Sequence, residues 1–213
     1  MNIALIGATG FVGSAVLDEL LHRGHRVTVL ARNPAKLAAR ERLAVVAADA
    51  QDAAQVAKAA AGHDAVVSAY NPGWSNPNIH DEFLKGTRAI IDGTKQAGVR
   101  RFLMVGGAGS LFVAPGVQLV DTPQFPAEWK QGALAAREAL NWIRTESALD
   151  WTFLSPPILL QPGERTGQYR LGDEAPLMNG EQPGSISVAD LAVAIADELE
   201  TPRHVQKRFT VAN

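Results

Sequence analysis

Cysteine is absent from this chain of 213 residues. Thiol catalysis, disulfide bonds and cysteine-ligated metal sites are therefore excluded. The 5 histidines are scattered along the chain. Scattered histidines without any cysteine predict that no metal is bound.

Tyrosine is scarce as well. The chain has 2 tyrosines, and the residues four positions after Tyr70 and Tyr169 are Trp74 and Asp173. A Tyr-x-x-x-Lys pair, which can serve as a general acid–base couple for carbonyl and alcohol chemistry, is therefore missing. We do not expect ordinary alcohol dehydrogenase or sugar epimerase chemistry.

Clusters of basic residues and long apolar runs are also missing. The net charge is −2 and Lys and Arg are scattered, which argues against nucleic acid or an anionic membrane as the main partner. No apolar run approaches transmembrane length. The first apolar run begins at Asn2, so we expect no signal peptide and a cytoplasmic protein. An apolar content of 46% in a chain of this length predicts one globular domain, residues 1–213.

The beginning of the chain carries the strongest pattern. A short apolar run over residues 2–6 predicts a buried strand, and G-A-T-G-F-V-G follows it. Val12, Val16 and Leu20 then recur at helical spacing, with Asp18 and Glu19 on the other side of the predicted helix. A second apolar run over residues 26–31 completes a βαβ unit with parallel strands.

The three glycines of that motif predict separate roles. Gly7 permits the tight turn after the strand, Gly10 lets a pyrophosphate approach the start of the helix, and Gly13 lets the helix pack close to the sheet. The spacing is G-x-x-G-x-x-G, and a tight turn without any ligand is the alternative. Its place between a strand and a helix favours binding of a dinucleotide.

The rest of the chain continues to alternate between strands and helices, which predicts an α/β fold: a Rossmann-type doubly wound parallel sheet with helices on both faces. The predicted helices cover residues 34–40, 53–61, 80–97 and 127–145, and a last helix runs from a Ser187 cap to Glu200. Further strands are predicted at 43–48, 65–69, 101–105, 151–154, 169–171, 185–187 and 208–211. Residues 106–126 are predicted to be irregular, and residues 161–187 to form a small C-terminal lid.

In open α/β sheets, ligands bind beyond the carboxyl ends of the strands. The residues at these ends are the predicted cofactor contacts: Gly7, Ala8, Thr9, Gly10, Phe11, Val12, Arg32, Lys36, Asp49, Ala50, Ser68, Ala69, Tyr70, Val105, Gly106, Gly107, Pro156, Pro157 and Ile158.

Arg32 indicates which dinucleotide is bound. NAD-preferring proteins place an acidic residue at the end of the second strand, but here Arg32 stands there with Lys36 one turn further on. A guanidinium at this place suits the 2′-phosphate of NADP(H), although a solvated arginine leaving a strand is the alternative. Asp49 is expected either to accept a hydrogen bond from the adenine amino group or to cap the next helix.

Candidates for the chemistry itself are few. Ser110, His80 and Lys130 are the candidate catalytic residues, with Lys130 either near the nicotinamide ribose or solvated on its helix, and with His80 either a proton donor or a surface residue. Five residues in or beside the long loops are the predicted substrate pocket; the alternative for the aromatic ones is that they pack on each other. These five are Trp74, Ser110, Phe112, Phe125 and Trp129. Trp142 and Trp151 are predicted to lie in the core.

The opening G-A-T-G-F-V-G, with A-R-N-P after the second strand, resembles the atypical short-chain dehydrogenases with NAD(P)-binding Rossmann folds. The stretches T-F-L-S-P-P, Q-P-G-E-R-T-G-Q-Y-R and R-F-T-V-A-N are similar to bacterial NADH–flavin reductases. These are relatives of the biliverdin-IXβ reductase and flavin reductase family and, more distantly, of NmrA-like proteins. The resemblance covers essentially the whole chain. It implies cofactor contacts in the glycine loop, at Arg32 and at the turns of Ser68, Gly106 and Pro157, and it places Ser110 near a serine close to the substrate.

The resemblance implies an NAD(P)H-dependent reductase; Arg32 favours NADP(H), while NAD(H) stays open. Its acceptor would be a flavin, a quinone or a similar flat conjugated molecule such as a linear tetrapyrrole. Such a ring spreads the negative charge, so solvent can protonate it and no strong protein acid is needed. A second hypothesis is an NmrA-like redox sensor that binds NADP(H) without turnover and acts through a protein partner. A third, a sugar-nucleotide or isoflavone-type reductase, is weakened by the missing tyrosine. Monomer and dimer both stay open.

Overall fold

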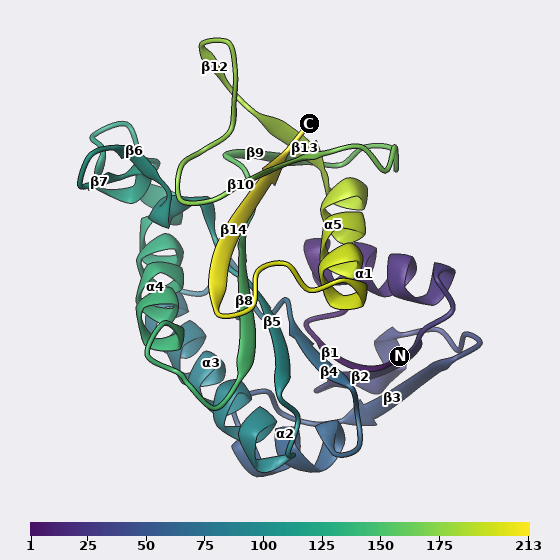
Figure 1. Ribbon diagram of the computed structural model, residues 1–213. Coiled ribbons are helices and arrows are strands. Elements are labelled where there is room, and N and C mark those ends of the chain that lie inside the picture. Colours follow the sequence, from purple (N-terminus) through teal and green to yellow (C-terminus); the bar gives the residue numbers. More distant parts are fainter.

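A sheet of eight strands lies between two layers of helices in the computed structural model, which describes residues 1–213 (Figure 1). The order of the strands is β10-β14-β8-β5-β4-β1-β2-β3. All neighbours pair in parallel except β10, which is antiparallel to β14. The strands are β1 (Asn2–Ile6), β2 (Arg26–Ala31), β3 (Leu43–Ala47), β4 (Ala65–Ser68), β5 (Arg101–Val105), β8 (Asp150–Ser155), β10 (Arg170–Gly172) and β14 (Lys207–Ala212).

Helices cover both faces of this sheet. On one face α1 (Phe11–His22) packs against α5 (Val188–Glu200), and on the other α2 (Ala53–Ala60), α3 (Ile79–Gln96) and α4 (Ala127–Ile143) lie side by side (Figure 1). This arrangement confirms the predicted α/β fold with a parallel sheet and helices on both faces. None of the helices combines the length and the apolar character that crossing a membrane requires.

Each face of the sheet has its own hydrophobic core. Phe102, Phe153 and Ile90 are buried in the core beneath α2, α3 and α4, and Leu5 and Phe209 are buried beneath α1 and α5. Burial of such side chains is the main source of stability for a sheet covered on both sides. Trp151 is buried as predicted, whereas Trp142 is only partly buried and packs against the edge of its core under the guanidinium of Arg88.

The predicted helix over residues 34–40 is wrong. Only a 3₁₀ turn, η1 (Pro34–Lys36), forms there, and Leu37 is already extended with φ −110° and ψ 124°. The connection between the parallel strands β2 and β3 must run back along the length of a strand. An extended chain covers about 3.3 Å per residue and a helix only about 1.5 Å. A connection as short as the one between β2 and β3 therefore has to stay largely extended.

The predicted irregular stretch 106–126 contains short ordered elements. Two 3₁₀ turns, η2 (Ala108–Ser110) and η3 (Leu119–Asp121), flank a small hairpin of β6 (Phe112–Ala114) and β7 (Val117–Gln118). Gly116 provides the turn with φ +73°, a backbone conformation that glycine adopts without strain. The hairpin projects beyond the start of α4 (Figure 1).

The predicted lid, residues 161–187, is called the C-terminal strap below. It begins where β9 (Leu159–Gln161) ends, includes the hairpin of β11 (Met178–Asn179) and β12 (Gln182–Pro183), and ends with β13 (Ser185–Ser187), which pairs with β9. Ser187 caps α5 as predicted, because its Oγ accepts from the backbone nitrogen of Asp190 at 3.0 Å.

Side chains of α1 and α5 hold the strap in place. The buried carboxylate of Asp190 accepts from the backbone nitrogens of Thr166 and Gly167 at 2.8 and 2.7 Å. Glu19 pairs with Arg165 of the strap at 2.7 Å and with Arg23 at 2.7 Å. The sequence places Glu19 on the face of α1 opposite the apolar residues, but its side chain is only 5% exposed because the strap covers it.

Candidate functional site

The loop between β1 and α1 is shaped by close backbone contacts. Gly7 has φ +87°, and a Cβ there would stand 2.3 Å from the carbonyl oxygen of Ala69 at the end of β4. A Cβ at Gly13 would stand 2.0 Å from the carbonyl oxygen of Gly7. Only glycine fits at these two positions, since real Cβ contacts are never so short. They bring the start of α1 tightly onto the end of β1.

Gly10 differs from these two glycines. It is the exposed N-cap of α1, with an ordinary φ of −87°, and no side chain caps the helix. No acidic residue stands in the first turn. The free amides and the positive dipole end of α1 therefore face a surface without side chains at Gly10, and this arrangement fits a phosphate group.

Arg32 directly follows β2 and is exposed, and so is Lys36 in η1. Neither side chain forms an ion pair or a hydrogen bond in the structure, and no carboxylate follows β2. Asn33 is occupied with capping η1, where its Oδ1 accepts from the backbone nitrogen of Ala35 at 3.2 Å. Two cations without partners thus stand at the end of the second strand, where they suit a phosphorylated ribose.

The residue that caps α2 is Asp52, whose Oδ1 accepts from the backbone nitrogens of Ala54 and Gln55 at 2.9 and 3.1 Å. The capping alternative for Asp49 is therefore wrong. Asp49 closes a local turn instead, with Oδ1 accepting from the nitrogen of Gln51 at 2.9 Å. This turn leaves Oδ2 of Asp49 without a partner at the end of β3.

Tyr70 follows β4, but its ring turns toward α3. A Cβ at Gly86 of α3 would stand 2.3 Å from the Tyr70 ring, and the Tyr70 hydroxyl donates to the carbonyl oxygen of Glu82 at 3.3 Å. The same hydroxyl accepts from Gln51 at 3.1 Å. Burial raises the pKa of Tyr70. The hydroxyl is thus protonated at neutral pH and already occupied, so it does not act as a base.

Glycines follow the end of β5, and prolines follow the end of β8. A Cβ at Gly106 would stand 2.0 Å from Cζ of Phe153, and Gly106 donates its backbone N–H to Leu154 at 2.8 Å. Pro157 is buried while Gly107 and Pro156 are partly exposed. The turns at this end of the sheet are therefore built from backbone and small side chains.

Ser110, the serine singled out by the sequence, is buried and only 2% exposed. Its hydroxyl oxygen accepts from Nη1 of Arg208 at 3.2 Å. Arg208 is not among the residues predicted from the sequence, where its one signal is a lone charge inside the apolar run R-F-T-V-A-N.

The two other catalytic candidates lie on helices. His80 stands in the first turn of α3, with Nδ1 3.0 Å from Asp81 and Nε2 3.8 Å from Glu138 of α4. Lys130 is exposed in the first turn of α4 and makes no ion pair. No group of three or more His, Asp or Glu side chains in the structure could hold a metal ion.

The aromatic residues of the predicted substrate pocket differ in exposure. Trp74 is 58% and Trp129 51% exposed, whereas Phe112 and Phe125 are half-buried. The ring of Trp74 packs against α4, since a Cβ at Gly132 of α4 would stand 2.7 Å from that ring. The loop after β4 thus contacts the first half of α4. The exposed indole rings of Trp74 and Trp129 belong to these two segments.

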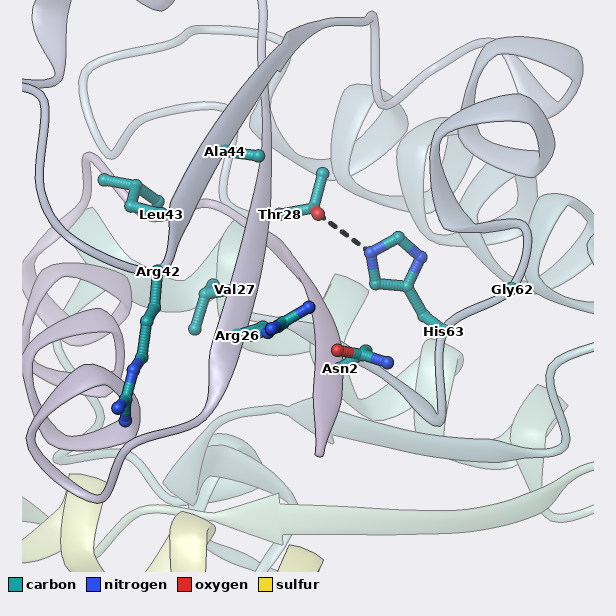
Figure 2. Close-up of a pocket in the computed structure, with 9 residues that line it drawn as sticks. All are labelled: Asn2, Arg26, Val27, Thr28, Arg42, Leu43, Ala44, Gly62 and His63. Carbon is teal, nitrogen blue, oxygen red and sulfur yellow. Dashed lines mark hydrogen bonds between the residues drawn. The ribbon is translucent and has the colours of Figure 1, made fainter.

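Two open grooves lie along β2 and β3, the first at their amino ends and the second reaching Ala47 at the carboxyl end of β3. Figure 2 shows the first, a groove of about 380 Å³ at the amino ends of β1, β2 and β3. His63 and Thr28, which line it, hydrogen-bond to each other at 2.8 Å, and Arg42 donates to the carbonyl of Gly24 at 3.0 Å. The second, of about 500 Å³, continues along β3 and α2. Ligands of open α/β sheets bind at the carboxyl ends, so we place the site there.

Comparison with known proteins identifies the family of this chain. A sequence model of the family described as NAD(P)H-binding matches residues 7–202. The uncharacterized protein YwnB of Bacillus subtilis is 39% identical over 216 residues, covering 100% of this chain and 99% of its own. A crystal structure from Bacteroides thetaiotaomicron, named a "putative epimerase", has 47% identity and a TM-score of 0.92, and covers 99% of this chain and 96% of that one. Another from Streptococcus pneumoniae TIGR4, named a "putative NADH-flavin reductase", has 34% identity and a TM-score of 0.86, and covers 100% and 99%.

Proposed function

The chain belongs to the NAD(P)H-binding family, and we propose that it is an NADPH-preferring reductase that transfers hydride to a flat conjugated acceptor such as a flavin or a quinone. One observation supports the choice of acceptor: the hydroxyl and imidazole candidates near the strand ends already have partners in the protein, and among the catalytic candidates only the exposed Lys130 has none. Tyr70 is turned into α3, Ser110 accepts from Arg208, and His80 lies between two carboxylates.

The residues at the strand ends have distinct roles toward the cofactor. The uncapped start of α1 at Gly10 would hold the pyrophosphate, Arg32 and Lys36 the 2′-phosphate, and Asp49 the adenine amino group. Gly106 and Gly107 let the nicotinamide end lie close to the backbone. The reduced nicotinamide, when bound, supplies the hydride.

The protein's contribution to the reaction is to orient the acceptor. Trp74 and Trp129 offer exposed apolar faces, and Phe112 and Phe125 are half-buried. Holding two reacting rings in contact replaces a bimolecular encounter, which is a large contribution to rate. Because the acceptor ring spreads its negative charge, protonation can come from solvent.

The likeness to a structure named an epimerase does not change this proposal. Epimerisation at a carbon bearing a hydroxyl requires a base and an acid placed at that carbon. The hydroxyl of Tyr70 is engaged by Gln51 and Glu82, and the hydroxyl of Tyr169 donates to the carboxylate of Asp197 in α5. Neither tyrosine is available for that task.

The experiment that tests the proposal measures NADPH oxidation against a panel of flavins and quinones, with titration calorimetry of NADPH and NADH on the same preparation. We expect tighter binding of NADPH and turnover of at least one flat acceptor. Tight NADPH binding without turnover of any acceptor would contradict the reductase assignment and favour a redox sensor. Turnover of a sugar nucleotide in its place would favour the epimerase class.

A further inference from the structure

Arg208, in β14, is a buried arginine whose side chain is 0% exposed. Its Nη1 donates to the hydroxyl oxygens of Ser110 at 3.2 Å and of Ser155 at 3.3 Å. Its Nη2 donates to the carbonyl oxygen of Glu174 at 3.3 Å and pairs with the carboxylate of the same residue. One guanidinium thus contacts three residues that are far apart in the sequence.

These three partners belong to the segments that border the acceptor side of the site. Ser110 lies in η2 after β5, Ser155 ends β8, and Glu174 belongs to the C-terminal strap. Glu174 in turn accepts from the backbone nitrogen of Phe112 at 2.8 Å, and both its carboxylate oxygens accept from Arg144 at 2.9 Å. Arg208 therefore fixes Ser110 directly and Phe112 through Glu174.

Stability alone does not account for this arrangement. Burying a guanidinium costs free energy that well-packed apolar side chains would not cost, and Nε of Arg208 has no hydrogen-bond partner. Burial opposes ionisation of Glu174, but hydrogen bonds from Arg208 and Arg144 outweigh it and lower the pKa of the Glu174 carboxyl. The pair is therefore charged at neutral pH. A buried, directional group of this kind holds its neighbours in one arrangement.

We propose that Arg208 is a positioning residue for the acceptor. It holds the loop of Ser110 and Phe112 at the place where the acceptor must lie against the nicotinamide. This inference rests on the proposed reductase function. It requires that the acceptor side of the site depends on Arg208 while the cofactor loop around Gly10 does not.

The test compares Arg208→Met and Arg208→Lys with the wild type and with Arg170→Met. Arg170 is the matched control: it is exposed on the neighbouring strand β10 and donates to Asn179 and to the carbonyl of Asn213. For Arg208→Met we expect kcat/KM for the acceptor to fall tenfold or more, mainly through KM, with the Kd for NADPH within twofold of wild type. The kcat/KM of Arg208→Lys should lie between those of Arg208→Met and the wild type, and the kcat/KM of Arg170→Met should be near that of the wild type.

Amide hydrogen exchange gives a readout that does not depend on activity. In Arg208→Met the peptides covering residues 106–118 should exchange at least tenfold faster, and those covering residues 1–20 should not change. If the wild type turns over no acceptor, the reductase assignment fails and the positioning role fails with it; if the wild type turns over an acceptor and Arg208→Met keeps the wild-type acceptor kinetics, only the positioning role fails. Unchanged exchange, unchanged acceptor kinetics, or an equal loss of NADPH affinity overturns it. Should Arg208→Met fail to fold, Arg208→Lys and Glu174→Gln decide by the same measurements, with smaller effects in the same direction.

Discussion

Gly13 lies so close to Gly7 that a Cβ on Gly13 would stand 2.0 Å from the carbonyl oxygen of Gly7. Gly10 lies between them in sequence, yet a Cβ there would stand 3.3 Å from the same oxygen and meet nothing else. Gly7 and Gly13 therefore serve the packing of α1 on β1. Gly10 leaves the start of α1 open. Two of the three glycines are therefore needed for packing, and the third leaves space for a ligand.

Gly10→Val should abolish cofactor binding while the protein stays folded. The new side chain would stand over the free amides of α1, where the pyrophosphate is expected, and the φ of −87° suits any residue. Calorimetric titration with NADPH and far-UV circular dichroism measure the two effects. Gly13→Ala is the matched control, and it should lose stability by about 1–3 kcal/mol or more from overpacking. Normal NADPH binding by Gly10→Val would mean that the phosphates lie elsewhere.

Arg32→Ala should weaken NADPH binding by about 1.5–3 kcal/mol, the scale of a hydrogen bond to a charged group. NADH binding should hardly change, because NADH has no 2′-phosphate. Arg26→Ala is a control from the same strand, since Arg26 begins β2 and Arg32 follows its end. Titration of each variant with both cofactors gives the answer. Equal affinity of the wild type for NADPH and NADH would remove the basis of the prediction.

No polar side chain at the site should be indispensable for turnover. We expect His80→Ala, Ser110→Ala and Tyr70→Phe each to keep activity within about tenfold, less than the ~10²–10⁴ of general acid–base catalysis. Trp129→Ala and Phe125→Ala should do more harm, because misplacing the acceptor can cost on the order of a hundredfold. Steady-state kinetics with NADPH and a saturating acceptor compare the five variants. A loss above about a thousandfold in one polar variant, with cofactor binding intact, would reveal a proton donor.

Short apolar runs, each the length of one strand, made most of the fold predictable. Residues 101–105 and 65–68 are buried on both faces, so their strands stand out without an alignment. The hairpin of β6 and β7 could not be predicted in the same way, because strands of three and two residues show no periodicity. The extended course after Lys36 follows from the distance between two strand ends, which a local pattern does not contain.

The site divides along the same line. Gly7, Gly10 and Arg32 could be singled out from the sequence, because the roles predicted for them depend on their place after a strand or at the start of a helix. Arg208 could not, since its partners Ser110 and Ser155 are 98 and 53 residues away. Glu19 was misplaced on the solvent side for the same reason, because the strap that covers it arrives 146 residues later.

Ionisation of Glu19 should make the free energy of unfolding depend on pH in the acid range. Hydrogen bonds from Arg165 and then from Arg23 outweigh burial and lower the pKa of Glu19 from 4.5 to about 2. A carboxyl whose pKa is lower in the folded state contributes stability above the unfolded pKa, and this is lost as pH falls toward the folded pKa. For Glu19 the loss lies between pH 4.5 and about 2 and amounts to up to about 3 kcal/mol.

Urea unfolding of the wild type and of Glu19→Gln at pH 7, 5 and 3 measures this contribution. At pH 7 the wild type should have a larger free energy of unfolding than Glu19→Gln. At pH 3 this difference between the two proteins should be smaller by about half or more. Glu41→Gln is the control, because Glu41 is 89% exposed and should follow the wild type at every pH. A gap that stays constant with pH would show that Glu19 titrates normally.

The position of β14 between β8 and β10 has a consequence for how the protein is made. On the ribosome β14 is the last strand of the sheet to emerge, yet it fills an interior place. Until residues 207–212 appear, β8 presents an unpaired edge, and the apolar surface that Phe209 covers stays open to water. Unpaired edges with exposed apolar surface favour association between incomplete chains. Nascent chains that stall after β8 are therefore the form of this protein most in need of a chaperone.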